Sequence, residues 1–298
     1  METLQTEGFA KINLGLDVVR RLENGYHEVK MVMQTVGIYD TITLKKIPEG
    51  ICFFSESGEI PCDDTNLAYK AARLFLEALQ EKEDTSVSGK DISGTVGGVE
   101  ISLVKRIPVA AGMAGGSTDA AAVLRGMNEL FQAGFTTEEL QKIGLKIGAD
   151  VPYCIMGGTA LAEGIGEKLT SLKKAKDMPL LVVKPDIFVS TKEVYQSLHL
   201  DENTDHPDID GMVKAIEKGD AGADDIIPYM GNVLQDVTEK MHPIVRQIID
   251  RMQAQGAKKA MMSGSGPSVF GIFETEEDAK RAKESFSDFR QVFVTHLV

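Results

Sequence analysis

Residues 108–122 read Pro-Val-Ala-Ala-Gly-Met-Ala-Gly-Gly-Ser-Thr-Asp-Ala-Ala-Ala, a glycine-rich segment that runs directly into an alanine-rich one. Glycine adopts positive φ without steric cost and lets a ligand approach the backbone, whereas alanine favours helix. Ser117 and Thr118 stand where the first turn of that helix is expected. A loop that opens a helix leaves backbone N–H groups free beside the positive end of the helix dipole. The segment therefore predicts an anion site that suits a phosphate.

This glycine loop (residues 108–118) matches neither of the two best-known phosphate motifs. A Walker A loop requires Gly-Lys-Ser/Thr, and no lysine lies near Gly116. The dinucleotide fingerprint requires Gly-x-Gly-x-x-Gly directly after a strand, and the spacing here differs. A glycine-rich turn before an ordinary helix therefore stays open as an alternative for this stretch alone.

The bulk composition restricts the class of protein. With 298 residues, the chain is long enough for one large or two smaller domains. Its formal net charge of −13 argues against nucleic acid or an anionic membrane as a partner, but a helix N-terminus can still bind a nucleotide phosphate. The three cysteines form no zinc or disulfide pattern, and neither a signal peptide nor a membrane span is recognisable. We therefore expect a cytoplasmic protein.

Hydropathy periodicity predicts a mixture of strands and helices. Alternating or short apolar runs predict strands at residues 9–13, 36–44, 99–103, 180–183, 258–262, 269–273 and 292–297. Helical spacing and caps predict helices at residues 66–80, 117–131, 136–148, 208–218, 243–256 and from 275 onward. Residues 81–98 are polar and read as a surface loop or hairpin, and the glycines of 157–166 as a break where one domain hands over to another. These elements favour an α+β fold.

Polar residues at three places are candidates for chemistry. Lys11 and Asn13 are two apart in a predicted strand, so they project from one face, although a solvent-facing pair is the simpler explanation. Tyr26 and His27 follow a predicted Asn-Gly turn. Asp150 stands between a helix stop and a Val-Pro step, where catalytic residues often lie, although a turn-forming Asp is the simpler explanation.

Three stretches in this order resemble the GHMP kinases, the family of galactokinase, homoserine kinase and mevalonate kinase. They are Lys11-x-Asn13, the glycine loop and the serine–glycine segment (residues 263–268, Ser-Gly-Ser-Gly-Pro-Ser). Residues 10–14, 24–27, 148–152 and 262–266 narrow the resemblance to members that phosphorylate a cytidine diphosphate-linked methylerythritol of the non-mevalonate isoprenoid route. Met113 and Ala114 depart from the usual loop residues in bulk but change no polar group.

The resemblance implies a two-domain fold and a nucleotide site. The expected domains are a ribosomal-protein-S5-like ATP-binding domain over residues 1–163 and a ferredoxin-like substrate domain over residues 164–298. The glycine loop would hold the phosphates of ATP through Pro108, Val109, Ala110, Ala111, Gly112, Met113, Ala114, Gly115, Gly116, Ser117 and Thr118. Mg²⁺ would accompany ATP, with Ser117 as a candidate ligand.

The resemblance also implies roles in catalysis and substrate binding. Asp150 would be the general base, and Lys11 would stabilise the developing alkoxide and orient Asp150, since a close Lys–Asp pair keeps the carboxylate ionised. Substrate binding would fall to Asn13, Tyr26, His27, Thr191, Tyr195, Gly264 and Ser265, with the two tyrosines sandwiching the cytosine. No nucleic-acid or membrane partner is expected, and the protein would be a monomer or homodimer. Another small-molecule kinase of this scaffold, or a nucleotide-binding protein without catalysis, remains the rival interpretation.

Overall fold

The computed structural model describes residues 2–86, 97–202 and 204–298, and the chain clusters into two compact units with interleaved segments. The first unit comprises the chain up to Phe9, Tyr39–Val109 and Gly115–Met156; the second comprises Ala10–Ile38, Ala110–Ala114 and Gly157–Val298. Strands β1 (Thr3–Arg21) and β2 (His27–Ile47) contribute residues to both. The predicted functional division after residue 163 stays a prediction.

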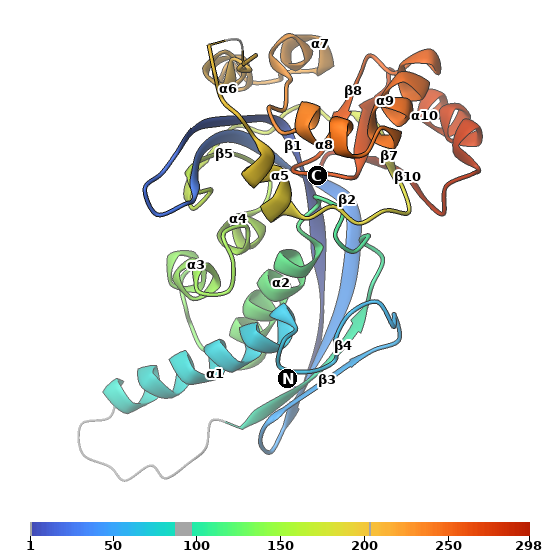
Figure 1. The fold of residues 1–298 in the computed structure, drawn as a ribbon. Helices are drawn as coiled ribbons and strands as arrows, with labels where there is room; N and C mark the ends of the chain where they lie inside the picture. Colours follow the sequence, from blue (N-terminus) through green and yellow to red (C-terminus); the bar gives the residue numbers. More distant parts are fainter. Residues whose placement is uncertain (1, 87–96, 203) are drawn as a thin grey trace. The chain divides into compact units, whose positions relative to one another are not determined.

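The first unit packs helices against strands (Figure 1). Its part of β2 pairs antiparallel with β4 (Gly98–Val104), with Ile42 opposite Leu103, and β4 pairs parallel with β3 (Ile51–Ser55). The helices are α1 (Leu67–Ser86), α2 (Gly115–Leu130), α3 (Thr137–Leu145) and α4 (Val151–Met156). Buried apolar residues that alternate along the strands face the apolar stripes of these helices, which is the pattern that the periodicity predicted.

The second unit contains an antiparallel four-stranded sheet. Its strand order is β10 (Gln291–His296), β7 (Pro179–Lys184), β9 (Val269–Ile272) and β8 (Lys259–Met262). Helix α9 (Ile244–Ala254) packs on β8 and β9, and α10 (Glu276–Lys283) packs on β7 and β10. Phe270 and Phe286 are fully buried in this layer, and burial of such a side chain stabilises the fold by roughly 1.5–3 kcal/mol.

Shorter elements complete the second unit. Strand β5 (Thr159–Gly164) pairs antiparallel with β2 and with β6 (Lys168–Ser171). The remaining helices are α5 (Thr191–Ser197), α6 (Ile209–Glu217), α7 (Ala223–Ile226) and α8 (Gln235–Met241), with 3₁₀ turns at Ile227–Tyr229 and Glu284–Phe286. Caps predicted from sequence are present, since the Thr136–Glu139 capping box begins α3 and Thr275 caps α10.

One local expectation was wrong. Residues 81–86 continue α1 instead of forming a loop, because helical hydrogen bonding outlasts the apolar stripe on which the predicted end was based; the rest of that expectation, residues 87–96, lies outside the described residues. The glycines of 157–166 lie where they were expected to, at the passage from one unit to the other, because the second unit resumes at Gly157. They bracket β5 and form the turn toward β6, so that this stretch belongs to the sheet.

Candidate active site

The middle of the glycine loop, residues 110–114, docks on the serine–glycine segment within the second unit. Gly112 has φ +71°, and a Cβ at this position would lie 2.2 Å from the carbonyl oxygen of Ser263. The Ser263 hydroxyl donates a 3.0 Å hydrogen bond to the carbonyl oxygen of Gly112. Ala110 and Ala114 also have positive φ, at +51° and +57°. Glycine is therefore required at position 112, and the loop is held in a conformation that alanine rarely adopts.

Lys11 lies beside this part of the loop. Its backbone N–H donates a 3.2 Å hydrogen bond to the carbonyl oxygen of Met113, and its ammonium donates one of 2.8 Å to the Asn13 side-chain oxygen. Both side chains are buried, so the solvent-facing alternative for the pair is wrong. Within the described part of the second unit this ammonium forms no ion pair. A buried charge without a counter-charge is costly, which makes Lys11 a candidate anion ligand.

Side chains from two other segments hold the serine–glycine segment. The Asn232 amide donates hydrogen bonds to the carbonyl oxygens of Met262 (2.9 Å) and Gly264 (2.8 Å). The Ser265 hydroxyl lies 2.7 Å from the Thr191 hydroxyl at the start of α5. Sequence reasoning placed Gly264, Ser265 and Thr191 in the site but missed Asn232. The only signal for Asn232 was a Gly-Asn pair, which is typical of any turn.

Aromatic side chains gather at the turn between β1 and β2. The predicted Asn-Gly turn is present, with Gly25 at φ +85°. The His27 ring lies 5.1 Å from the Tyr195 ring, tilted by 37°, whereas Tyr26 is 60% exposed. Partial burial, assisted by the positive charge of Arg21, lowers the pKa of His27 below 6.5. The second unit thus offers an imidazole that packs on one aromatic ring, next in sequence to a tyrosine whose ring is open to solvent.

The ends of the glycine loop belong to the first unit. Helix α2 begins at Gly115, so its first residues present free N–H groups, and the Thr118 hydroxyl donates to the carbonyl oxygen of Phe9 at 2.5 Å. A Cβ built on Gly148 would lie 3.9 Å from the Ser117 hydroxyl oxygen, which brings the turn before α4 close to the start of α2. Asp150 is half-exposed in that turn, and its carbonyl oxygen accepts the Cys154 N–H of α4 at 3.0 Å.

The predicted site residues therefore divide into two groups. The first unit holds Pro108, Val109, Gly115, Gly116, Ser117, Thr118 and Asp150; the second holds Lys11, Asn13, Tyr26, His27, Ala110, Ala111, Gly112, Met113, Ala114, Thr191, Tyr195, Gly264 and Ser265. Within the described ranges, no three His, Cys, Asp or Glu side chains converge as a metal site.

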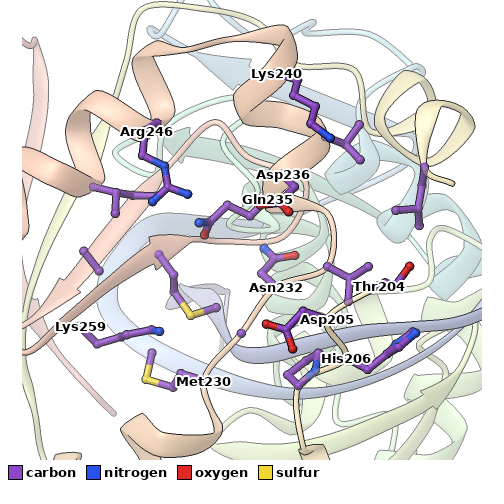
Figure 2. A pocket seen from close by; sticks show the side chains of 18 of the residues that line it. Thr204, Asp205, His206, Met230, Asn232, Gln235, Asp236, Lys240, Arg246 and Lys259 are labelled. Atoms are coloured by element: carbon purple, nitrogen blue, oxygen red, sulfur yellow. The ribbon is translucent and has the colours of Figure 1, made fainter. Parts of the chain in front are cut away.

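A cavity of about 900 Å³ opens elsewhere in the second unit (Figure 2). Asn232 and Gln235 lie along it, and none of the predicted site residues does. Its basic side chains, from Lys240, Arg246 and Lys259, are matched by aspartates at 201, 205, 208 and 236. Since these charges nearly cancel, the cavity favours neither an anion nor a cation. Asn232 and Gln235 connect this cavity to the serine–glycine segment, since both side chains bond to the backbone of Met262.

Comparison with known proteins decides the family. The description "GHMP kinases N terminal domain" matches residues 66–158, and "GHMP kinases C terminal" matches residues 212–290. The chain belongs to the GHMP kinase family. It is therefore a kinase with the two-domain GHMP fold, as the motifs indicated. Among the described residues, every helix is too short or too polar to span a membrane.

Relatives cover almost the whole chain. The 4-diphosphocytidyl-2-C-methyl-D-erythritol kinase of Lachnospira eligens is 48% identical over 99% of this chain and 98% of its own, and that of Lachnoclostridium phytofermentans is 48% identical over 95% and 92%. A crystal structure of 4-(cytidine 5'-diphospho)-2C-methyl-D-erythritol kinase is 31% identical with a TM-score of 0.81, covering 99% of both chains. Homoserine kinase from Cytophaga hutchinsonii shares the fold at 18% identity, with a TM-score of 0.74 over 100% of this chain and 95% of that one.

Proposed function

We propose that this kinase transfers the γ-phosphoryl group of ATP to the 2-hydroxyl of 4-diphosphocytidyl-2-C-methyl-D-erythritol, in the non-mevalonate route to isoprenoid precursors. The names of the 48%-identical relatives support the substrate. The observation that carries the proposal is the buried Lys11 ammonium, on a strand whose backbone bonds to the glycine loop. A phosphoryl donor and an alcohol acceptor both need such a positive charge.

The glycine loop would bind the phosphates of ATP. The free N–H groups at the start of α2 and the positive end of its dipole suit the β- and γ-phosphates. Backbone donors held in advance need little reorganisation when negative charge develops, which is how a loop of this kind stabilises a phosphoryl-transfer transition state.

Mg²⁺ would be held chiefly by ATP itself. This metal keeps several waters and takes one or two protein oxygen ligands together with phosphate oxygens. Its binding therefore does not require three converging His, Cys, Asp or Glu side chains, and the described ranges contain no such group. Ser117, whose hydroxyl lies near the turn that carries Asp150, is the residue that we assign to it. When bound, Mg²⁺ would neutralise phosphate charge. Side chains of the protein would position the alcohol and accept its proton.

Asp150 would accept the proton of the 2-hydroxyl. It is half-exposed at the junction before α4, so a substrate can reach its carboxylate. Lys11 would stabilise the alkoxide as the proton leaves, and Asn13 would hold the substrate by hydrogen bonding. Because Asn13 already accepts from the Lys11 ammonium, it also fixes the direction of that group.

The cytosine would bind at the aromatic cluster. Tyr26 offers an open ring face for stacking, Tyr195 offers a second ring, and His27 offers a polar edge for the base. Thr191 and Ser265 would contact the substrate on the side of the cytidine that carries the diphosphate. A small aliphatic alcohol needs no such clamp, which favours this substrate over those of other GHMP kinases. Because the reaction consumes ATP, we place it in the cytoplasm.

The deciding experiment is a turnover assay with ATP, Mg²⁺ and the cytidylyl substrate. Asp150→Asn is expected to lower kcat by about 10²–10⁴-fold without a change in melting temperature. Asp177→Asn, at an exposed position outside the site, is the matched control and should behave as wild type. Normal turnover in Asp150→Asn would refute the base. Phosphorylation of homoserine, mevalonate or a sugar alone would refute the substrate, and ATP binding without ADP release would favour a non-catalytic role.

A further inference from the structure

A buried group of three charged side chains joins the two ends of the glycine loop. The Lys105 ammonium lies 2.6 Å from a carboxylate oxygen of Asp40 and 2.7 Å from one of Asp119. The side chains are 5%, 0% and 4% exposed, respectively. All three belong to the first unit: Lys105 directly follows β4, Asp40 lies in β2, and Asp119 lies in the first turns of α2.

Asp40 fixes the chain just before the loop. Its second carboxylate oxygen accepts the backbone N–H groups of Arg106 (2.5 Å) and Ile107 (2.9 Å). Two backbone donors and one ammonium leave this carboxylate little freedom. Residues 105–107, which lead into Pro108, are therefore held by one side chain.

Asp119 and Gly115 fix the chain just after the loop. A Cβ on Gly115 would lie 3.0 Å from the Lys105 nitrogen, so the glycine that begins α2 also leaves room for the ammonium. Lys105 thus reaches across from the end of β4 to the first turns of α2. The loop between them has both of its ends tied to a single nitrogen atom.

Stability alone does not explain this arrangement, because removing three charged groups from water has a large desolvation cost. Two carboxylates share one ammonium, and the outer oxygen of Asp119 has no hydrogen-bond partner among the described residues. Burial, with a further contribution from the Asp40 charge, raises the pKa of Asp119 despite the opposing Lys105. Apolar residues of similar volume often stabilise a fold as well as buried ion pairs do, or better, so what these three side chains contribute is a fixed geometry.

We propose that Lys105 and Asp119, together with Asp40, form a clasp that sets the separation of β4 and α2 and so preorganises the phosphate-binding N–H groups of the glycine loop. Lys105 and Asp119 are positioning residues and need not touch the nucleotide. This inference rests on the proposed role of the glycine loop in ATP binding. It adds that the clasp helps to set the affinity of the protein for ATP. Preorganisation of donors lowers the entropy that is lost on binding.

The test compares Asp119→Ala with Asp119→Asn in the full chain. Alanine removes the acceptor for Lys105 but leaves the neutral Lys105–Asp40 pair, whereas asparagine keeps an acceptor oxygen. We expect Asp119→Ala to weaken binding of a non-hydrolysable ATP analogue about tenfold by calorimetry, and to accelerate amide hydrogen exchange in residues 106–118. Asp119→Asn should retain the affinity within about twofold and keep the wild-type exchange.

A second lysine provides the matched control. Lys258 also bridges two carboxylates, Asp224 and Glu274, but on the surface of the second unit. Lys258→Met should leave both readouts unchanged. If Asp119→Ala does not fold, as judged by circular dichroism, Asp119→Ser replaces it, because its hydroxyl is too short to reach Lys105. The proposal is overturned if Asp119→Ala, or Asp119→Ser in its place, keeps the wild-type affinity for the ATP analogue and the wild-type amide exchange in residues 106–118. Absence of analogue binding in the wild type would refute the ATP site, and the exchange data would still decide the clasp.

Discussion

The Ser263 hydroxyl donates a 3.0 Å hydrogen bond to the carbonyl oxygen of Gly112, and the two backbones approach so closely that no side chain fits between them. Two segments that are 151 residues apart in the sequence therefore depend on one glycine for their contact. The glycine loop owes its shape here to a neighbouring backbone and not to its own sequence alone.

Replacing Gly112 by alanine tests this contact. Gly112→Ala combines a positive φ with a Cβ that would lie 2.2 Å from the Ser263 oxygen, so we expect a loss of more than about 2 kcal/mol in unfolding free energy and a sharp fall in turnover. Gly256→Ala is the matched control, since Gly256 has φ +93° but no atom within 4 Å of its Cβ. It should lose only about 1 kcal/mol. Equal losses in urea unfolding would show that the contact is unimportant.

The exposed ring of Tyr26 should affect substrate binding without affecting stability. Tyr26→Leu removes a stacking surface worth about 1–3 kcal/mol per base, so KM for the cytidylyl substrate should rise tenfold or more. KM for ATP and the melting temperature should stay at their wild-type values. Tyr195→Leu should raise the same KM and also lower the melting temperature slightly, because this ring packs on His27.

Phe54→Leu is the control for the aromatic experiment. Phe54 is 56% exposed in the first unit, so the variant loses a similar open ring away from the cluster. Its KM should equal that of wild type. If Tyr26→Leu also leaves the KM unchanged, the base does not stack on Tyr26.

Substrate binding should weaken in acid through His27. Its pKa in the folded protein lies below 6.5, so the neutral ring persists below that pH and the KM should rise only once the pH falls through the lowered value. Arg21→Gln removes a charge that disfavours the protonated ring. The acid limb should therefore move to higher pH in Arg21→Gln and disappear in His27→Asn. A KM profile identical in all three proteins would exclude His27 from binding.

Asp119 should make the folded state less stable as the pH rises. Its pKa is well above 3.8 in the folded protein, so the folded state holds a proton that the unfolded chain has already released. Stability is lost as the pH climbs from about 3.8 through the raised pKa, and the loss is complete above it. Asp119→Asn removes this penalty and should raise the free energy of unfolding at neutral pH, with the gain shrinking toward pH 4. Denaturant unfolding at several pH values measures it, and a pH-independent difference would contradict the assignment.

Local pattern was sufficient for most of the elements. The alternation around Lys11, the capping box at Thr136 and the helix after the glycine loop all form as their sequences predict, because periodicity and caps act within a few residues. The end of α1 was missed because helical hydrogen bonding can continue beyond an apolar stripe. The family, too, was recognisable from three short motifs in order.

The sequence by itself determined which residues could bind phosphate and where the turns and helices begin, since glycine, alanine and hydroxyl residues act on their own backbone. Only the tertiary structure decided what holds those residues in place. Gly112 meets Ser263, Asn232 supports Gly264, and Lys105 joins Asp40 to Asp119 across 79 residues of chain. Contacts between distant segments depend on how strands and helices pack, and no local pattern records that packing.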